Sequence, residues 1–295
     1  MKRKIIKLTL TLQSGEVVIE AKDENRISSR GLAVSTSITY GNGAITPTAQ
    51  ITVYGLPIET MNKFFRVQWN TMQAILNTVK IEVGESDDSL SVAYEGNITF
   101  ATVNMDGSPD VSLVITSQMA IVEKMTITPP FILSKGESAD VADIARYLAN
   151  ESNYEFVNNG VTHIVTDLTL NGSTIEKIEK LSQMCDFDLY IEQKLITICK
   201  KGTARELKVP VISPLTGLIG YPAPDIRGIT FSCLYDPIVR FGGIVTLKDS
   251  LIEIANADWR IYGLVSVLEA NIPQGKWQHN VNATWRDSKD AAVQR

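Results

Sequence analysis

Hydrophobic and polar residues alternate over most of the first 120 residues of the chain. This period of two predicts strands in a sheet that buries one face. Two of the strands flank Gln13-Ser14-Gly15, a short segment that is typical of a hairpin turn. The strands that we predict here cover residues 5–12, 16–21, 32–38, 48–54, 78–84, 91–104 and 111–117.

One helix interrupts this strand-rich part. Pro57 favours the first position of a helix, because an N–H at that position has no partner within the helix. We expect the helix to run to about Trp69 and to turn an apolar side toward the sheet. The candidates for that contact are Ile58, Met61, Phe64, Phe65 and Met72. Antiparallel strands with one helix predict a small barrel or a strongly bent sheet.

The pattern changes after Thr128-Pro129-Pro130, where two amphipathic helices are predicted. Ser138 can cap the first helix, which covers residues 139–150. Ser173 and Glu176 have the spacing of a capping box at the start of the second helix.

The remaining changes of pattern divide the chain into three parts. A hairpin is predicted over residues 187–199, with its turn at Glu192-Gln193-Lys194, and strands dominate again after residue 202. We therefore predict a first barrel at residues 1–122, a small α/β module at 123–202 and a second barrel at 203–295. The fold class is mainly β with a small α/β middle module.

Composition limits the kinds of protein that this chain can be. Its 295 residues, 44% hydrophobic and 21% charged, suffice for two or three domains with ordinary cores. Apolar runs fall short of the roughly 18 residues that a membrane-spanning helix needs. The basic N-terminus lacks the apolar block of a signal peptide. We therefore expect a protein made in a cytoplasm, without stable membrane insertion.

The charge balance argues against tight binding of nucleic acid. Net charge is −5, and the basic clusters are confined to Lys2-Arg3-Lys4 and Lys200-Lys201. Proteins that hold nucleic acid usually present a basic face to the phosphates.

No arrangement of residues indicates catalysis, a cofactor or a metal. Cys185, Cys199 and Cys233 form no CxxC pair, so we predict buried, reduced thiols. His163 and His279 lack the partners of a metal-binding motif and are expected on the surface or on a strand face. We therefore predict no enzyme activity and name no catalytic, cofactor or metal residue.

Two features keep alternatives open. Asp186 and Asp188 are expected on one side of a strand, where a carboxylate pair could support a peptidoglycan hydrolase. Solvated charges at a strand edge are the preferred interpretation. Exposed tryptophans could likewise stack on sugars in an all-β carbohydrate-binding or adhesion protein, although core or interface packing is preferred. The tryptophans are Trp69, Trp259, Trp277 and Trp285.

Several segments carry a resemblance to a known family. The segment Ile212 to Pro237 joins a loop with several Pro and Gly residues to an apolar strand. Further along lie Trp259-Arg260-Ile261-Tyr262 and the turn Pro273-Gln274-Gly275-Lys276-Trp277. Together they resemble the C-terminal barrel of the hub proteins at the centre of bacteriophage tail baseplates. The segment Ala49 to Pro57, followed by a helix, resembles the first barrel of such hubs.

This resemblance, over roughly residues 30–120 and 200–285, implies a structural protein of the virion tail baseplate, assembled in the bacterial host cytoplasm. It implies a homotrimeric ring to which each subunit contributes two barrels, and which joins a tail tube to a central spike. The implied partners are further copies of the chain, the tail tube protein, the central spike protein and other baseplate proteins. DNA would pass through the channel as cargo, which suits a weakly acidic chain because like charge repels phosphate.

A candidate interface follows from the loop predicted between Pro214 and Pro224. Its apolar members would form an exposed patch of the kind that soluble proteins avoid. We therefore predict that Leu215, Leu218, Ile219 and Tyr221 contact another subunit or a partner.

Overall fold

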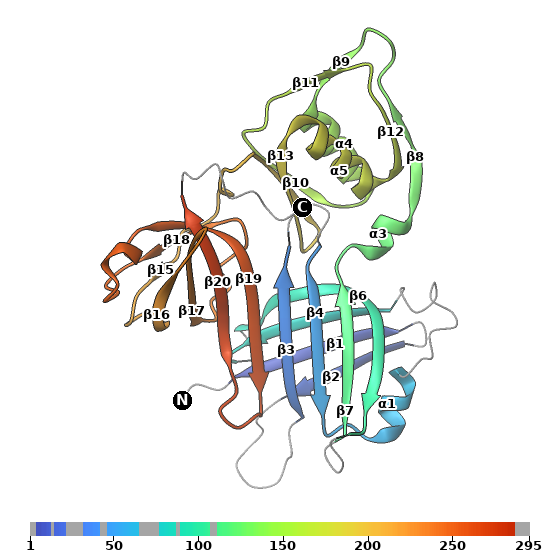
Figure 1. Ribbon diagram of the computed structural model, residues 1–295. Helices are drawn as coiled ribbons and strands as arrows, with labels where there is room; N and C mark the ends of the chain where they lie inside the picture. The colour runs from blue at the N-terminus through green and yellow to red at the C-terminus, as the bar shows by residue number, and fades with distance from the viewer. Residues whose placement is uncertain are drawn as a thin grey trace.

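The computed structural model describes residues 4–12, 15–21, 32–41, 46–64, 77–86, 89–106 and 111–286 (Figure 1). The fold is mainly β, as predicted. Its first part contains β1 (Ile5–Leu12), β2 (Gly15–Ala21), β3 (Ala33–Tyr40), β4 (Thr48–Tyr54), α1 (Ile58–Phe64), β5 (Thr78–Gly84), β6 (Ser91–Asn104) and β7 (Ser112–Gln118). All seven predicted strands are present, and β1, β4, β5 and β6 have the predicted bounds.

Helix α1 follows Pro57 as predicted. Met61 is buried, whereas Ile58 is 47% exposed. The prediction for the side chains of Phe64, Phe65 and Met72, and for the helix as far as Trp69, lies outside the described residues.

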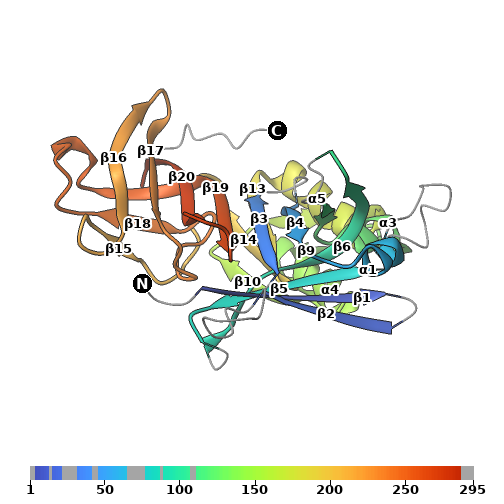
Figure 2. The ribbon, with the colours of Figure 1, turned by 90° about the horizontal axis from the view of Figure 1, so that it is seen from below.

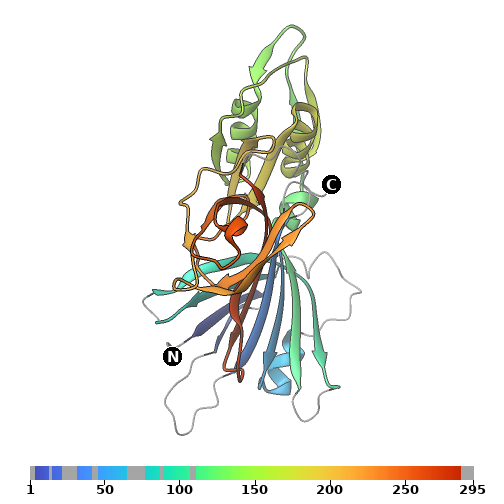
Figure 3. The same cartoon turned by 60° about the vertical axis from the view of Figure 1, so that its left-hand side comes forward.

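The middle part of the chain begins with α3 and ends with a hairpin. Its elements are α3 (Ile121–Met125), β8 (Ile127–Ile132), β9 (Ser138–Asp140), α4 (Val141–Glu151), β10 (Glu155–Asn159), β11 (Ile164–Thr166), β12 (Thr169–Ser173), α5 (Thr174–Cys185), β13 (Phe187–Glu192) and β14 (Leu195–Lys200). Strands β10, β14 and β13 form a sheet that packs with α4 and α5. Figure 3 shows this part projecting beyond one end of the long strands.

One predicted helix cap is confirmed and one is wrong. Ser173 and Glu176 form the capping box of α5. Helix α4 is capped by Asp140 and not by Ser138, which belongs to β9. The Asp140 carboxylate accepts a hydrogen bond from the Ala142 N–H at 2.7 Å, a stronger acceptor than a serine hydroxyl.

The last part of the chain contains β15 (Val211–Ile212), β16 (Leu218–Asp225), β17 (Gly228–Leu234), β18 (Ile244–Leu247), the 3₁₀ helix η2 (Glu253–Ala255), β19 (Asp258–Ala270) and β20 (Trp277–Trp285). The predicted loop between Pro214 and Pro224 is wrong over most of its length, because β16 begins at Leu218. Pro222 is tolerated there because β16 is an edge strand, whose outward N–H groups have no strand partner to lose. A bulge between Ile219 and Ala223 interrupts its pairing with β17.

The first and last parts of the chain share one 13-stranded sheet. Its main path runs β16-β17-β20-β19-β3-β4-β7-β6-β5-β1-β2. The two parts join where β19 pairs antiparallel with β3, from Leu264 opposite Tyr40 to Ala270 opposite Val34. Figure 1 shows β20, β19, β3 and β4 side by side, and Figure 2 places β15–β18 at one side of the molecule and α1 at the other. Among the described strands, no pairing closes a barrel.

Two hydrophobic cores lie beneath this sheet. One core combines the first part with the middle part, and the other belongs mainly to the last part. Hairpin β13–β14 contributes to both: Leu189 and Ile198 lie in the first core, and Tyr190 and Cys199 in the second. The three-part division of the chain stays a prediction. Within the described residues, no helix is both long and apolar enough to span a bilayer.

Candidate functional site

The long strands of the large sheet bury one face in the cores and leave the other uncovered. Strand registers place Thr39 opposite Val265 on one side and opposite Thr48 on the other, and Thr48 opposite Gln118. This row belongs to the uncovered face, since the residues that alternate with it are buried. We call the following residues the polar face: Thr230, Ser232, Gln278, Asn280, Asn282, Val265, Val267, Glu269, Ser35, Ser37, Thr39, Thr48, Gln50, Thr52, Val114, Thr116, Gln118, Phe100, Thr102 and Asn104.

Small, uncharged polar side chains dominate the polar face. Every member is partly or fully exposed. Glu269 is its single charged member, and the set includes no lysine or arginine. The side chains also bond to each other: the Ser35 hydroxyl lies 3.3 Å from a Glu269 carboxylate oxygen, and the Ser232 hydroxyl donates to Asn280 at 2.9 Å. Such a surface has few fixed charges with which to hold a polyanion.

The predicted interface residues lie at the edge of the sheet. Strand β16 has β17 on one side and no described strand on the other. Leu215 is 95% exposed, Tyr221 67% and Ile219 39%. Leu218 differs, because its side chain packs partly against the core of the last part. The structure therefore leaves three of the four residues available for contact.

The tryptophans form no exposed stripe within the described residues. Trp259 is buried, and Trp277 packs edge-on against Tyr235 with ring centroids 6.0 Å apart. Trp285 is 49% exposed and stacks on Trp259 at 4.4 Å. This agrees with the preferred interpretation as core packing for Trp259. Trp69 lies outside the described residues.

Trp285 also lines a groove of about 470 Å³ at one end of the last part. Ile226 and Ile254 line it as well, and both are strongly exposed. No local pattern indicates this groove, because its residues come from four separate segments of the chain. Single exposed apolar residues are ordinary on protein surfaces, so only their spatial clustering is informative.

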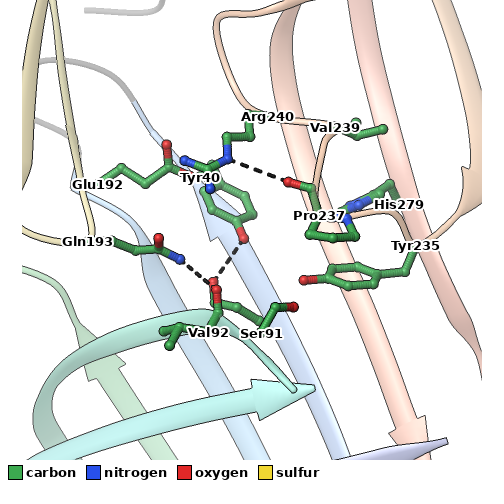
Figure 4. Close-up of a pocket in the computed structure, with 11 residues that line it drawn as sticks. Tyr40, Ser91, Val92, Glu192, Gln193, Tyr235, Pro237, Val239, Arg240 and His279 are labelled. Atoms are coloured by element: carbon green, nitrogen blue, oxygen red, sulfur yellow. Dashed lines mark hydrogen bonds between the residues drawn. The ribbon is translucent and has the colours of Figure 1, made fainter. Parts of the chain in front are cut away.

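A second cavity, of about 280 Å³, lies where the three parts of the chain meet (Figure 4). The Tyr40 hydroxyl donates to the Ala93 carbonyl at 3.2 Å, and Gln193 Nε2 donates to the Val92 carbonyl at 2.7 Å. Figure 4 shows the Tyr235 ring across the cavity from Gln193, and the Arg240 side chain beside Tyr40 and Glu192. Burial raises the pKa of Tyr235 to about 12, so its hydroxyl stays protonated near neutral pH.

His279 lies in the wall of this cavity, on the inward face of β20. Its Nε2 donates to the Asp236 carbonyl at 3.0 Å, so Nδ1 is the acceptor for the Ser266 hydroxyl at 2.8 Å. Ser266 is fully buried, so this hydroxyl–imidazole pair has no access to a substrate. Burial lowers the pKa of His279 to about 4, which keeps it neutral. The prediction of a strand-face histidine is confirmed for His279, and His163 is exposed.

The acidic pair is not arranged as predicted. Asp186 caps the C-terminus of α5 in a left-handed conformation and is not part of a strand. Asp188 is buried in β13, where it accepts the Gly202 N–H at 2.9 Å. Lys201 Nζ lies 3.3 Å from Asp188 and 3.7 Å from Asp186. The expectation of two solvated edge charges is therefore wrong for Asp188, which instead holds the end of the hairpin together.

The cysteines are free thiols. Cys199 and Cys233 are buried as predicted, whereas Cys185 is partly exposed. Burial raises the pKa of Cys199 and of Cys233 to about 12, so both remain protonated and weakly reactive. Among the described residues, no group of His, Cys, Asp and Glu is arranged to hold a metal ion.

The fold is that of bacteriophage tail proteins. A 43 kDa tail protein of prophage MuSo2 from Shewanella oneidensis superposes with a TM-score of 0.60 at 8% identity, covering 98% of this chain and 99% of that chain. A tail protein from Neisseria meningitidis MC58 superposes with a TM-score of 0.59 at 9% identity, covering 94% and 96%. At these identities the likeness concerns the fold alone.

The family is shown by the sequence itself. Residues 5–270 match the family model described as Baseplate hub gp41. The chain belongs to this baseplate hub family and is a structural component of a phage tail. No curated protein sequence matches it. The resemblance inferred from the sequence is thereby confirmed.

Proposed function

We propose that the chain forms a homotrimeric ring that joins the tail tube to the central spike and leaves a channel for DNA. The polar face is the observation that carries this proposal. It extends across the strands of both the first and the last part, so each subunit offers one continuous wall. A wall of serine, threonine, asparagine and glutamine offers no cation to bind phosphates, so DNA would pass without being held.

The two ends of this wall support closure of the ring. No described strand pairs with the outer edge of β16, and residues 99–104 of β6 pair only with β7 among the described strands. Successive strands along the path are antiparallel, so β16 and β6 run in opposite directions. The β16 edge of one copy therefore suits antiparallel pairing with β6 of the next. Such a head-to-tail contact closes a ring and removes both exposed edges.

The test is the mass and shape of the purified protein. Light scattering at micromolar concentration is expected to give three times the mass of one chain, and negative-stain microscopy to show rings with an open centre. An interface of this kind buries about 2,000 Å² or more. A protein that stays monomeric, also when its tail partners are present, contradicts the proposal.

Edge variants test the site of contact. Replacing Leu215 and Tyr221 by serine is expected to abolish the trimer at micromolar concentration while leaving the circular dichroism spectrum unchanged. Both side chains are exposed, so their removal costs the monomer little. Leu218 is unsuitable, because it also packs in the core. Leu251→Ser is the matched control: Leu251 is exposed in the same part of the chain but lies off the edge strand. A trimer that survives the double substitution excludes this edge as the contact.

The proposed neighbours above and below the ring are the tail tube protein and the central spike protein, with other baseplate proteins around it. The ring would bind them in the virion baseplate, after assembly in the host cytoplasm. Mixing the purified ring with recombinant tube or spike protein is expected to give a larger complex on size-exclusion chromatography. Failure to bind either protein contradicts the joining role.

A further inference from the structure

Hairpin β13–β14 of the middle part lies between the two cores. All six residues of β13 are buried. Leu189 and Ile191 face the core shared with the first part, whereas Tyr190 contacts Phe241 of the last part, with ring centroids 5.8 Å apart. A strand buried on both faces cannot shift without repacking both sides, because protein cores are densely packed.

The tip of this hairpin is bonded to the first part of the chain. Gln193 Nε2 donates to the Val92 carbonyl at 2.7 Å. Ala93, the next residue, is the extra residue of a bulge, since Ile81 pairs with Tyr94 and Glu82 with Val92. Bulges leave backbone groups outside the ladder. The Val92 and Ala93 carbonyls both receive side-chain donors here, the second from the Tyr40 hydroxyl.

The hairpin is also bonded to the last part. Glu192 forms a buried ion pair with Arg205, whose Nη1 lies 2.8 Å from the carboxylate. The same nitrogen donates to the Phe241 carbonyl at 3.0 Å, and the guanidinium lies 5.3 Å from the centre of the Tyr190 ring. Breaking a buried pair by removing one partner leaves an uncompensated charge, so this contact resists displacement.

These contacts lie at one end of the junction between β3 and β19. Tyr40 is the last β3 residue in that ladder, opposite Leu264, and it packs against both cores. A strand ladder fixes the register of two strands, whereas the twist between neighbouring strands varies over tens of degrees. The cavity of about 280 Å³ beside Tyr40 leaves room for such a change of twist. Something other than the ladder must therefore set the angle between the two sheet halves.

We propose that the β13–β14 hairpin is a brace that fixes the angle between the first and last parts of the large sheet. Gln193 of the hairpin attaches the brace to the Val92 carbonyl of the first part, and Tyr40 holds the adjoining Ala93 carbonyl in place. The Glu192–Arg205 pair attaches the brace to the last part through the Phe241 carbonyl. Resting on the proposed function, the same brace sets the curvature with which successive subunits close into a ring. The middle part then acts on ring geometry without contributing to the polar face.

A distance measurement on the full chain tests the brace. Spin labels at Glu59→Cys on α1 and Leu251→Cys in the last part report the angle, in a Cys185→Ser background that removes the partly exposed native thiol. Labelled chains are diluted tenfold with unlabelled chains, so that distances within one chain dominate. The parent is expected to give one narrow distance. The double variant Gln193→Ala with Tyr40→Phe, which removes both donors, is expected to broaden or shift it by several ångströms.

Lys194→Ala is the matched control, because Lys194 lies in the same turn but is exposed. An unchanged distance in the double variant, or an equal change in the control, overturns the brace. Tyr40→Phe alone keeps the packing of the aromatic side chain, and it replaces the double variant in the measurement if the double variant does not fold. The mass of the parent particle is measured separately. If the double variant broadens the distance but the parent is not trimeric, the brace is supported and the ring is contradicted. If the parent is trimeric but the double variant leaves the distance unchanged, the ring is supported and the brace is contradicted.

Discussion

At the scale of single residues, buried polar groups determine how the molecule responds to its surroundings. His279 is the clearest case, because burial lowers its pKa from 6.5 to about 4. The unfolded chain takes up a proton at this residue as the pH falls through 6.5, whereas the native protein does so only near 4. The stability that neutral His279 contributes is therefore fully present above pH 6.5, and it is lost progressively as the pH falls from 6.5 to 4. The full effect amounts to about 3 kcal/mol.

Urea denaturation at pH 7 and pH 4.5 measures this effect. His279→Gln removes the titrating group, so we expect its stability to fall less steeply over that interval than that of the parent. His163→Gln, at an exposed position, is the control and is expected to follow the parent. Parallel pH dependences for the parent and His279→Gln are incompatible with a histidine that stays neutral in the fold.

Buried charges were beyond the reach of sequence reasoning. Lys177 lies between apolar residues on α5 and is fully buried. Its Nζ donates to the Thr128 hydroxyl at 2.7 Å and to the Pro129 carbonyl at 2.5 Å. These acceptors lie almost 50 residues earlier in the chain, so no local pattern indicates them. Burial lowers the pKa of this lysine. Arg205 was missed for the same reason, since Glu192 becomes its partner only in the folded chain.

At the scale of elements, sequence motifs predicted the structure correctly where the interacting residues are close together in the chain. The capping box of α5 is one such signal: the Ser173 hydroxyl accepts the Glu176 N–H at 3.2 Å, and the Glu176 carboxylate accepts the Ser173 N–H at 2.9 Å. Ser173→Ala leaves a buried helix N–H without its acceptor. We expect a loss of about 1 kcal/mol in unfolding free energy, within the range for N-cap substitutions. Thermal denaturation is the measurement, with exposed Thr162→Ala as the control. Equal melting of the two variants would show that the box contributes nothing.

Other elements were predicted wrongly because a neighbouring residue took the expected role, or because pairing with a distant strand outweighed the local sequence preference. Ser138 is a good capping residue, yet Asp140 lies two positions later and its carboxylate takes the role. Pro222 and Pro224 indicated a loop, but an edge strand tolerates them because only one side of it is paired. The alternating pattern of β1, β4 and β5 predicted these strands correctly, because each strand buries one face of a continuous sheet.

At the scale of the whole molecule, the polar face predicts how the protein behaves toward DNA. We expect no measurable binding of duplex DNA at about 0.15 M salt, and weak binding at most when the salt is lowered, because the face has no cation to release counterions. Fluorescence anisotropy with a labelled duplex is the measurement. Replacing Gln50 and Thr116 by lysine puts positive charge at neighbouring positions of the face and is expected to create salt-dependent binding. Micromolar, salt-dependent binding by the parent protein contradicts a passive channel.

The composition of the polar face was partly predictable, because the net charge of −5 already argued against a basic surface. Its arrangement was not. The alternation within each strand identifies an uncovered face, but the order of strands depends on pairings between distant segments. Val265 and Thr39 become neighbours only through the β19–β3 ladder. No pattern in either segment predicts that these two strands pair.

That ladder also affects how the protein is made. The Ser35 hydroxyl meets Glu269 across a separation of 234 residues. At roughly 5–20 residues per second, a ribosome needs about 10–50 s to synthesise the intervening chain. During that interval the outer edge of β3 is already available but its partner does not yet exist. An unpaired strand edge is a template for aggregation. The yield of soluble protein is therefore expected to depend on translation speed and on chaperones that cover this edge until synthesis has passed Ala270.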